Sequence, residues 1–175
     1  MRTVLLAACV GVASLGVAGI AQAPPSKPDT TMLELMRGIV YPSSNVVFAA
    51  QSDLSVYPQE EHPATSPNLL TSVYPGWQAV ELASLAVAES TRLYLVPGRT
   101  CGNGRPVPVT NADWVQFTED TRQAGLVAHK AAQTKDQDAM VEAAGTVADA
   151  CLACHRVYRD NSGDPADRCR AIPGR

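Results

Sequence analysis

The chain has 175 residues, of which 46% are hydrophobic and 18% charged, and its formal net charge is −3 at pH 7. This acidic balance argues against nucleic acid as a partner, because nucleic-acid-binding domains carry a basic patch or stripe. After the first 23 residues no apolar run approaches the roughly 20 residues that a membrane-spanning helix needs. We therefore expect no membrane span in the rest of the chain.

Residues 1–23 have the three parts of a secretory signal peptide. A positive start at Arg2 is followed by an apolar run over 4–20 and by a small-residue cleavage site that ends at Ala23. Cys9 resembles a lipoprotein acceptor, but the apolar run before it is too short for that interpretation. The sequence thus predicts export to the periplasm and a single mature domain over 24–175, whose net charge is −4 after the loss of Arg2.

Apolar residues then recur near a helical period in four segments. The first helix follows a Pro-rich stretch, has Asp29 or Thr30 as its cap and continues to about residue 51, and Pro42 should kink or restart it. Three prolines within 52–70 predict a long surface loop. The second helix covers 77–96. Its expected core positions are Val80, Leu82, Leu85, Ala86, Leu93 and Tyr94.

A Gly- and Pro-rich loop over 100–109 contains Cys101 and separates the second helix from the third. The third helix starts at Thr110 or Asn111. Thr134 followed by Gln137 resembles a capping box that opens the fourth helix, which has an Ala-rich inward stripe. Four helices without a strand pattern predict an all-α, antiparallel, up-down-up-down four-helix bundle.

Near the end of the fourth helix stands the string Cys151-Leu152-Ala153-Cys154-His155. Two thiols three residues apart share one helix face, and a histidine directly after them is typical of covalent attachment of a c-type haem. In that interpretation Cys151 and Cys154 form thioethers and His155 is an axial iron ligand. The alternatives are a thioredoxin-like pair, which needs a βαβ context, half of a zinc site, which needs further ligands, and a chance occurrence in a chain that contains cysteines.

The longer string C-L-A-C-H-R-V-Y-R resembles the class II c-type cytochromes, the cytochrome c′ family. In that family the haem motif also lies near the C-terminus, with Ala before the second Cys and Tyr and a basic residue after the His. The resemblance implies one covalent haem c in a four-helix bundle. It also implies that Arg159 contacts a haem propionate, although a solvated arginine favoured by the helix dipole is an equal alternative.

For the sixth iron ligand, the resemblance points to the first helix, where low-spin members of the family have a methionine. Met36-Arg37-Gly38-Ile39 has their order of methionine, basic, small and aliphatic residues. Met36 is therefore the favoured ligand and Met32, one turn earlier, the alternative. Core packing is the competing role for both methionines.

Three functions are compatible with these features. The favoured one is an electron carrier, not an enzyme, that exchanges electrons with redox partner proteins and has histidine and methionine as iron ligands. The second is a five-coordinate protein that binds nitric oxide or carbon monoxide, and the third is a subunit of a redox enzyme. The resemblance also leaves a homodimer open.

Cys101 and Cys169 remain once the signal peptide and the haem have taken three of the five cysteines. The periplasm is oxidising and the bundle order brings both residues to the same end, so we expect a disulfide between them, with two free thiols as the alternative. Five aromatic residues are interpreted as core residues without a role: Tyr74, Trp77, Tyr94, Trp114 and Phe117. Two histidines, His62 and His129, are interpreted as surface residues.

Overall fold

The computed structural model describes residues 27–170, and the expected signal peptide lies outside them. Within this range the chain is helical, with one isolated β-bridge between Thr100 and Pro106 and no named strand. The elements are α1 (Met32–Leu35), the π-helical turn η1 (Met36–Val40), α2 (Tyr41–Ala49), the 3-10 turns η2 (Leu54–Val56), η3 (Pro63–Thr65) and η4 (Leu69–Thr71), α3 (Trp77–Ser90), the 3-10 segment η5 (Thr91–Leu95), α4 (Ala112–Thr134), α5 (Gln137–Tyr158) and the 3-10 turn η6 (Pro165–Asp167).

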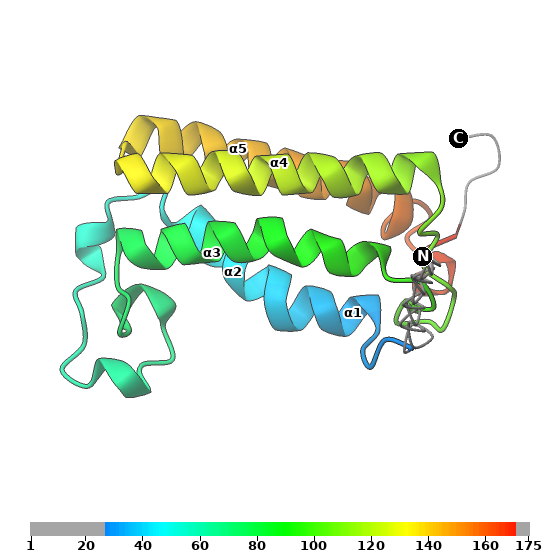
Figure 1. Cartoon of the computed structure of the whole chain (residues 1–175), viewed down its shortest axis with the longest axis horizontal. Coiled ribbons are helices and arrows are strands. Elements are labelled where there is room, and N and C mark those ends of the chain that lie inside the picture. Colours follow the sequence, from blue (N-terminus) through cyan, green and yellow to red (C-terminus); the bar gives the residue numbers. More distant parts are fainter. Residues whose placement is uncertain (1–26, 171–175) are drawn as a thin grey trace, which may run out of the picture.

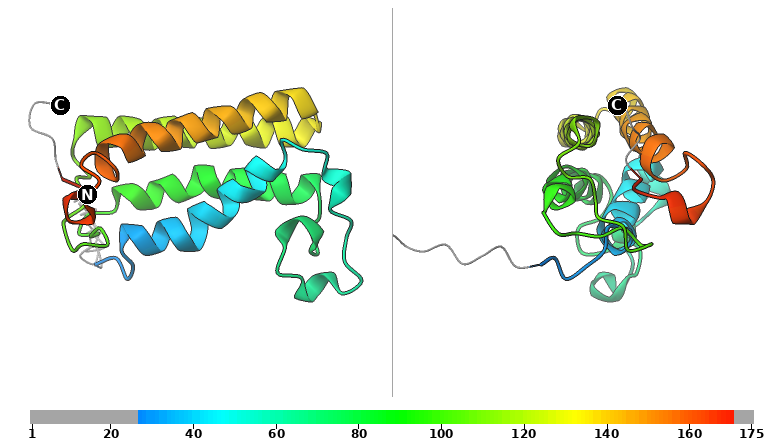
Figure 2. Two further views of the ribbon diagram at one scale, coloured as in Figure 1. Left: turned by 180° about the vertical axis from the view of Figure 1, so that it is seen from behind. Right: turned by 90° about the vertical axis from the view of Figure 1, so that its right-hand side faces the viewer.

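These elements form four rods that pack together and run alternately in opposite directions, as expected for an antiparallel bundle (Figure 1). α1, η1 and α2 make the first rod, and α3 with η5 makes the second. The two ends of the bundle differ. We call the end where α1 starts and α5 finishes the motif end, and the end with the long 50–76 connection and the α4–α5 turn the loop end (Figure 2).

The first rod accommodates Pro42 by widening one turn. Proline has no amide hydrogen and its ring clashes with the carbonyl four residues earlier in a regular helix. Here the turn before it is π-helical, and the Tyr41 amide donates to the carbonyl oxygen of Met36, five residues back. The rod therefore continues past Pro42, and Ile39 in the widened turn is exposed.

Two helix caps differ from those expected. The first rod is capped by Thr31, not by Asp29 or Thr30, in a reciprocal capping box with Glu34. α5 is capped by Asp136, whose carboxylate accepts from the Ala139 amide at 3.0 Å, whereas Thr134 is the last residue of α4. Lys135 between them has a left-handed backbone, φ 55°, which ends α4 before a new cap can form.

Small side chains fill the core at the loop end. The buried face of α3 consists of residues such as Ala79, Ala83 and Ala88, while Leu82 and Leu85 are exposed, contrary to expectation. The reason is a close approach of α4: a Cβ built on Gly125 would lie 2.8 Å from the Ala88 amide nitrogen. We call this cluster the small-residue core. Its fully buried members are Val47, Val80, Val87, Ala128, Ala144, Val147 and Met140.

Toward the motif end the rods separate. α2 packs against both α3 and α5, but the first rod moves away from α5 as it approaches α1 (Figure 1). A second apolar cluster, with Met32, Tyr94, Trp114 and Tyr158 among its members, lies at this end. Among residues 27–170, no helix is long and apolar enough to cross a membrane.

Candidate functional site

A cavity of about 940 Å³ lies between the first rod, α4 and α5 at the motif end. Its volume is at the upper end of the roughly 300–1,000 Å³ typical of ligand and cofactor sites. Every residue of the predicted site contributes to its lining. These residues are Met32, Met36, Cys101, Cys151, Cys154, His155, Arg159 and Cys169.

The last turns of α5 supply one face of this cavity. Residues three and four apart lie on the same side of a helix, so Cys151, Cys154, His155 and Tyr158 all face the cavity together. The Asp136 cap and the α4 contact fix the helix along its length. The thiol pair and the histidine thus share a rigid element, and Cys151 and Cys154 are both free and half-buried.

Burial keeps both thiols protonated. It raises the pKa of Cys151, and it raises the pKa of Cys154 to about 12, with smaller contributions from the charges of Cys151 and Asp113. Disulfide oxidoreductases need the opposite, because their attacking cysteine works as a thiolate with a lowered pKa. The electrostatics of the pair therefore do not favour the thioredoxin-like alternative.

His155 is half-buried, and desolvation together with the nearby positive charge of Arg159 lowers its pKa below the usual value. A neutral imidazole is the form that binds a metal. Across residues 27–170 there is no group of three or more His, Cys, Asp and Glu side chains arranged to hold a metal ion. A zinc site built by the protein alone is thus not supported by the described part of the chain.

Both candidate methionines line the cavity from the side opposite α5. Met32 is only 6% exposed, and its amide donates to the Thr100 carbonyl oxygen at 2.8 Å, which ties the start of the first rod to the loop of Cys101. Met36 is half-buried and opens the π-helical turn. The geometry brings both sulfur-bearing side chains to the site that was expected to need one.

Aromatic side chains line the cavity, a role that the sequence analysis did not assign. Trp114 packs edge-on against Tyr158 with ring centroids 4.9 Å apart, and its Nε1 donates to the Tyr94 carbonyl oxygen at 3.3 Å. Phe117 lies edge-on to Tyr158 as well. One half of α4, the half nearest the motif end, carries Trp114, Phe117 and Thr121 at helical spacing. This spacing was the sequence signal that could have identified the residues lining the cavity.

Tyr158 and Tyr94 differ in their hydrogen bonding. The Tyr158 hydroxyl donates to Asp113 at 2.6 Å, and burial together with this bond raises the pKa of Tyr158 to about 12. Tyr94 is 5% exposed, yet its hydroxyl has no hydrogen-bond partner among the described residues. The nearby Ser90 hydroxyl donates to the Val87 carbonyl oxygen instead, at 3.0 Å. An unpartnered buried hydroxyl costs free energy.

Other singled-out residues lie away from the cavity. Tyr74 is 54% exposed, so its assignment to the core was wrong. His62 is exposed, as expected. His129 is half-buried, and its Nδ1 lies 3.0 Å from the Glu81 carbonyl oxygen on α3. None of the three lines the cavity.

The segment after α5 closes one side of the cavity. Cys169 forms a disulfide with Cys101, and their Cα atoms are 6.4 Å apart, so the expected pair lies together in the structure. Asn103 strengthens this attachment, because its Nδ2 lies within hydrogen-bonding distance of three carbonyl oxygens of the segment.

Arg159 extends its guanidinium to Asp160, with two contacts of 2.8 Å.

The charges around the cavity fit an anionic cofactor. Its lining contains Arg37, Arg159 and Arg168 but only one acid, Asp160, on a chain whose net charge is negative. Two buried polar atoms on the lining, the Tyr94 hydroxyl and the Arg168 Nε, lack partners within residues 27–170. A largely apolar cavity with buried thiols, an imidazole and surplus positive charge fits haem, a flat apolar group with two carboxylates.

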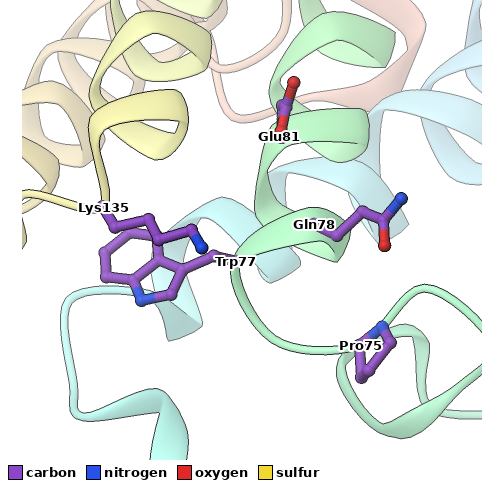
Figure 3. Close-up of a pocket in the computed structure, with 5 residues that line it drawn as sticks. All are labelled: Pro75, Trp77, Gln78, Glu81 and Lys135. Carbon is purple, nitrogen blue, oxygen red and sulfur yellow. The ribbon is translucent and has the colours of Figure 1, made fainter.

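A second, smaller depression lies at the loop end, where α3 begins and α4 gives way to α5. It is lined by Pro75, Trp77, Gln78, Glu81 and Lys135 (Figure 3). It contains no cysteine, histidine or methionine. We therefore place the candidate site in the larger cavity at the motif end.

No family model matches the chain, and searches of the curated proteins and of the solved structures likewise find no match.

Proposed function

We propose that the chain is a monohaem c-type cytochrome of the periplasm that transfers electrons between redox partner proteins. One observation carries this proposal: the thiols of the C-x-x-C-H motif, its histidine and two methionines converge on a single cofactor-sized cavity. Cys151 and Cys154 would hold haem c covalently, and His155 would bind its iron. The haem would supply the redox chemistry by gaining and losing one electron at its iron.

The protein's own residues would bind, orient and shield the cofactor. Trp114, Phe117 and Tyr158 would exclude water from it, and a low local dielectric is one of the factors that set a haem's reduction potential. Leu152 and Tyr41 line the cavity and are 42% and 67% exposed, so the cavity reaches the surface between α5 and the first rod. Electron exchange needs such an edge, where a partner can approach.

The proposal is tested by the reduced-minus-oxidised optical spectrum of the protein purified from a host that matures cytochromes c. We expect the sharp α-band of a low-spin c-type haem in the wild type and its loss in Cys151→Ser/Cys154→Ser. A matched control is Cys101→Ser/Cys169→Ser, which removes two cysteines outside the motif and should keep the band. A wild-type protein without haem absorption would overturn the proposal.

The sixth ligand separates the electron carrier from the gas-binding alternative. If Met36 is bound to the iron, Met36→Ala should give a five-coordinate, high-spin form that binds carbon monoxide readily, while Met32→Ala should keep the low-spin spectrum. The reverse pattern would assign the ligand to Met32. A wild-type spectrum that is already high-spin would favour the gas-binding protein.

A further inference from the structure

Arg168 lies on the disulfide-anchored segment after α5 and lines the cavity. Its Nε is buried and has no hydrogen-bond partner among residues 27–170. Buried donors in folded proteins almost always have a partner, and a charged donor loses the most when it has none. Arg168 thus places a guanidinium with an unpaired buried nitrogen on the lining of the cavity.

The other arginines on the segment after α5, and Arg105 beside it, are already engaged. Arg159 makes both of its contacts to Asp160, and Arg170 pairs with Asp167 at 3.1 Å. Arg105 donates its Nε to the Ala166 carbonyl oxygen at 2.9 Å. Arg168 takes part in none of the ion pairs found in the described residues. Its charge is thus the one on this segment that is not engaged in an ion pair.

The backbone on either side of Arg168 is held in place. The carbonyl oxygen of Arg168 accepts from Asn103 Nδ2 at 3.0 Å, and the next amide, that of Cys169, donates to the Tyr158 carbonyl oxygen at 2.7 Å. The disulfide fixes the same residue to the loop of Cys101. The backbone that carries this guanidinium is thus held in place before any ligand binds, which reduces the entropy lost on binding.

We propose that Arg168 binds a carboxylate of the cofactor in the cavity, which under the function proposed above is a haem propionate. A guanidinium presents two parallel N–H groups that match the two oxygens of a carboxylate. Arg168 takes the role that the sequence analysis gave to Arg159. The surplus of positive charge on the lining is consistent with a ligand that brings negative charge.

The test compares three variants of the haem-loaded protein: Arg168→Gln, Arg159→Gln and, as a control on the same segment, Arg170→Gln. Loss of a positive charge near the iron favours the ferric state and lowers the reduction potential. We expect this decrease in Arg168→Gln alone, together with a shift of the propionate bending band in the resonance Raman spectrum. Arg168→Lys, which keeps the charge but not the planar fork, should restore the potential in part while the band stays shifted.

Two results would overturn this assignment: an Arg168→Gln protein with the potential and propionate band of the Arg170→Gln control, or an equal or larger change in Arg159→Gln. A third result would also overturn the assignment, because it would mean that Arg168 binds a free anion. In that case the reduction potential of the wild type varies with added phosphate or acetate at constant ionic strength, and the propionate band is unchanged in Arg168→Gln. Should Arg168→Gln fail to fold, the band of Arg168→Lys decides. Absence of covalent haem from the wild type would instead overturn the proposed function, so the two failures are distinguishable.

Discussion

The two ends of the bundle differ in how the space between the rods is filled. In the small-residue core, alanines, valines and Met140 fill the space between the rods. Next to it, α3 and α4 touch closely at Ala88 and Gly125. At the motif end the rods diverge, and large side chains such as Trp114 and Tyr94 surround a cavity of about 940 Å³. Close packing stabilises the first region by itself. The second region has two buried polar atoms, the Tyr94 hydroxyl and the Arg168 Nε, that lack partners among residues 27–170.

This difference predicts a separation of effects. Substitutions in the small-residue core should change the free energy of unfolding and leave the cofactor's spectrum unaltered. Substitutions of the proposed haem ligands on the cavity lining should change the spectrum. The Cys101–Cys169 disulfide at the motif end is an exception. Its removal should change the free energy of unfolding, because the bridge is expected to stabilise an end of the bundle that is less closely packed.

The largest effect is expected from removal of the Cys101–Cys169 disulfide. The two residues are 68 positions apart, and closing a loop of this length stabilises a fold by about 4 kcal/mol in the chain-entropy account. Chemical denaturation of Cys101→Ala/Cys169→Ala should therefore show a free energy of unfolding lower by about that amount. Alkylation of both cysteines in the unreduced wild-type protein would contradict the presence of the bridge in solution.

The next effect compares two methionines, Met140 in the small-residue core and Met36 on the cavity lining. Met140 is completely buried, so Met140→Ala should lower the free energy of unfolding by about 2–5 kcal/mol. Its low-spin spectrum should remain that of the wild type. Met36→Ala should instead alter the spectrum, and a changed spectrum in Met140→Ala would break the separation between the two regions.

The smallest effect concerns two helical glycines. Gly125→Ala places a Cβ 2.8 Å from the Ala88 backbone, so α3 and α4 must move apart. This movement costs about 1–3 kcal/mol. The cost offsets or exceeds the gain in helix propensity, which is about 1 kcal/mol. Gly145 on α5 has nothing within 4 Å of the same position, so Gly145→Ala should stabilise the fold by up to about 1 kcal/mol. Thermal unfolding measures both, and equal stabilisation by the two substitutions would show that the helices are not closely packed.

Much of the arrangement follows from local patterns. Helical periodicity and the Pro- and Gly-rich connections predicted four antiparallel rods, and this order brought Met32, Met36, Cys101 and the C-x-x-C-H motif to one end. The buried face of α3 was mispredicted because hydrophobicity ranks Leu82 above Ala83, whereas the close approach of α4 requires small residues. That preference belongs to a pair of helices and is not visible in either one alone.

The site could be predicted from the sequence where its residues are close together in the chain. It could not be predicted where a residue reaches the cavity through long-range contacts. The spacing of Cys151, Cys154 and His155 identified them directly. Arg168 was missed because its place on the cavity depends on the path of the chain after α5. That path is set by Asn103 and by the Cys101–Cys169 bridge, more than 60 residues away along the chain.

The central claim, covalent haem at Cys151 and Cys154, is tested most directly by the denatured mass of the mature chain from a host that matures cytochromes c. Thioether bonds survive denaturation, so the account predicts the mass of residues 24–175 plus one haem. The Cys151→Ser/Cys154→Ser variant should have the mass of the bare polypeptide. A wild-type chain with that bare mass would contradict the account.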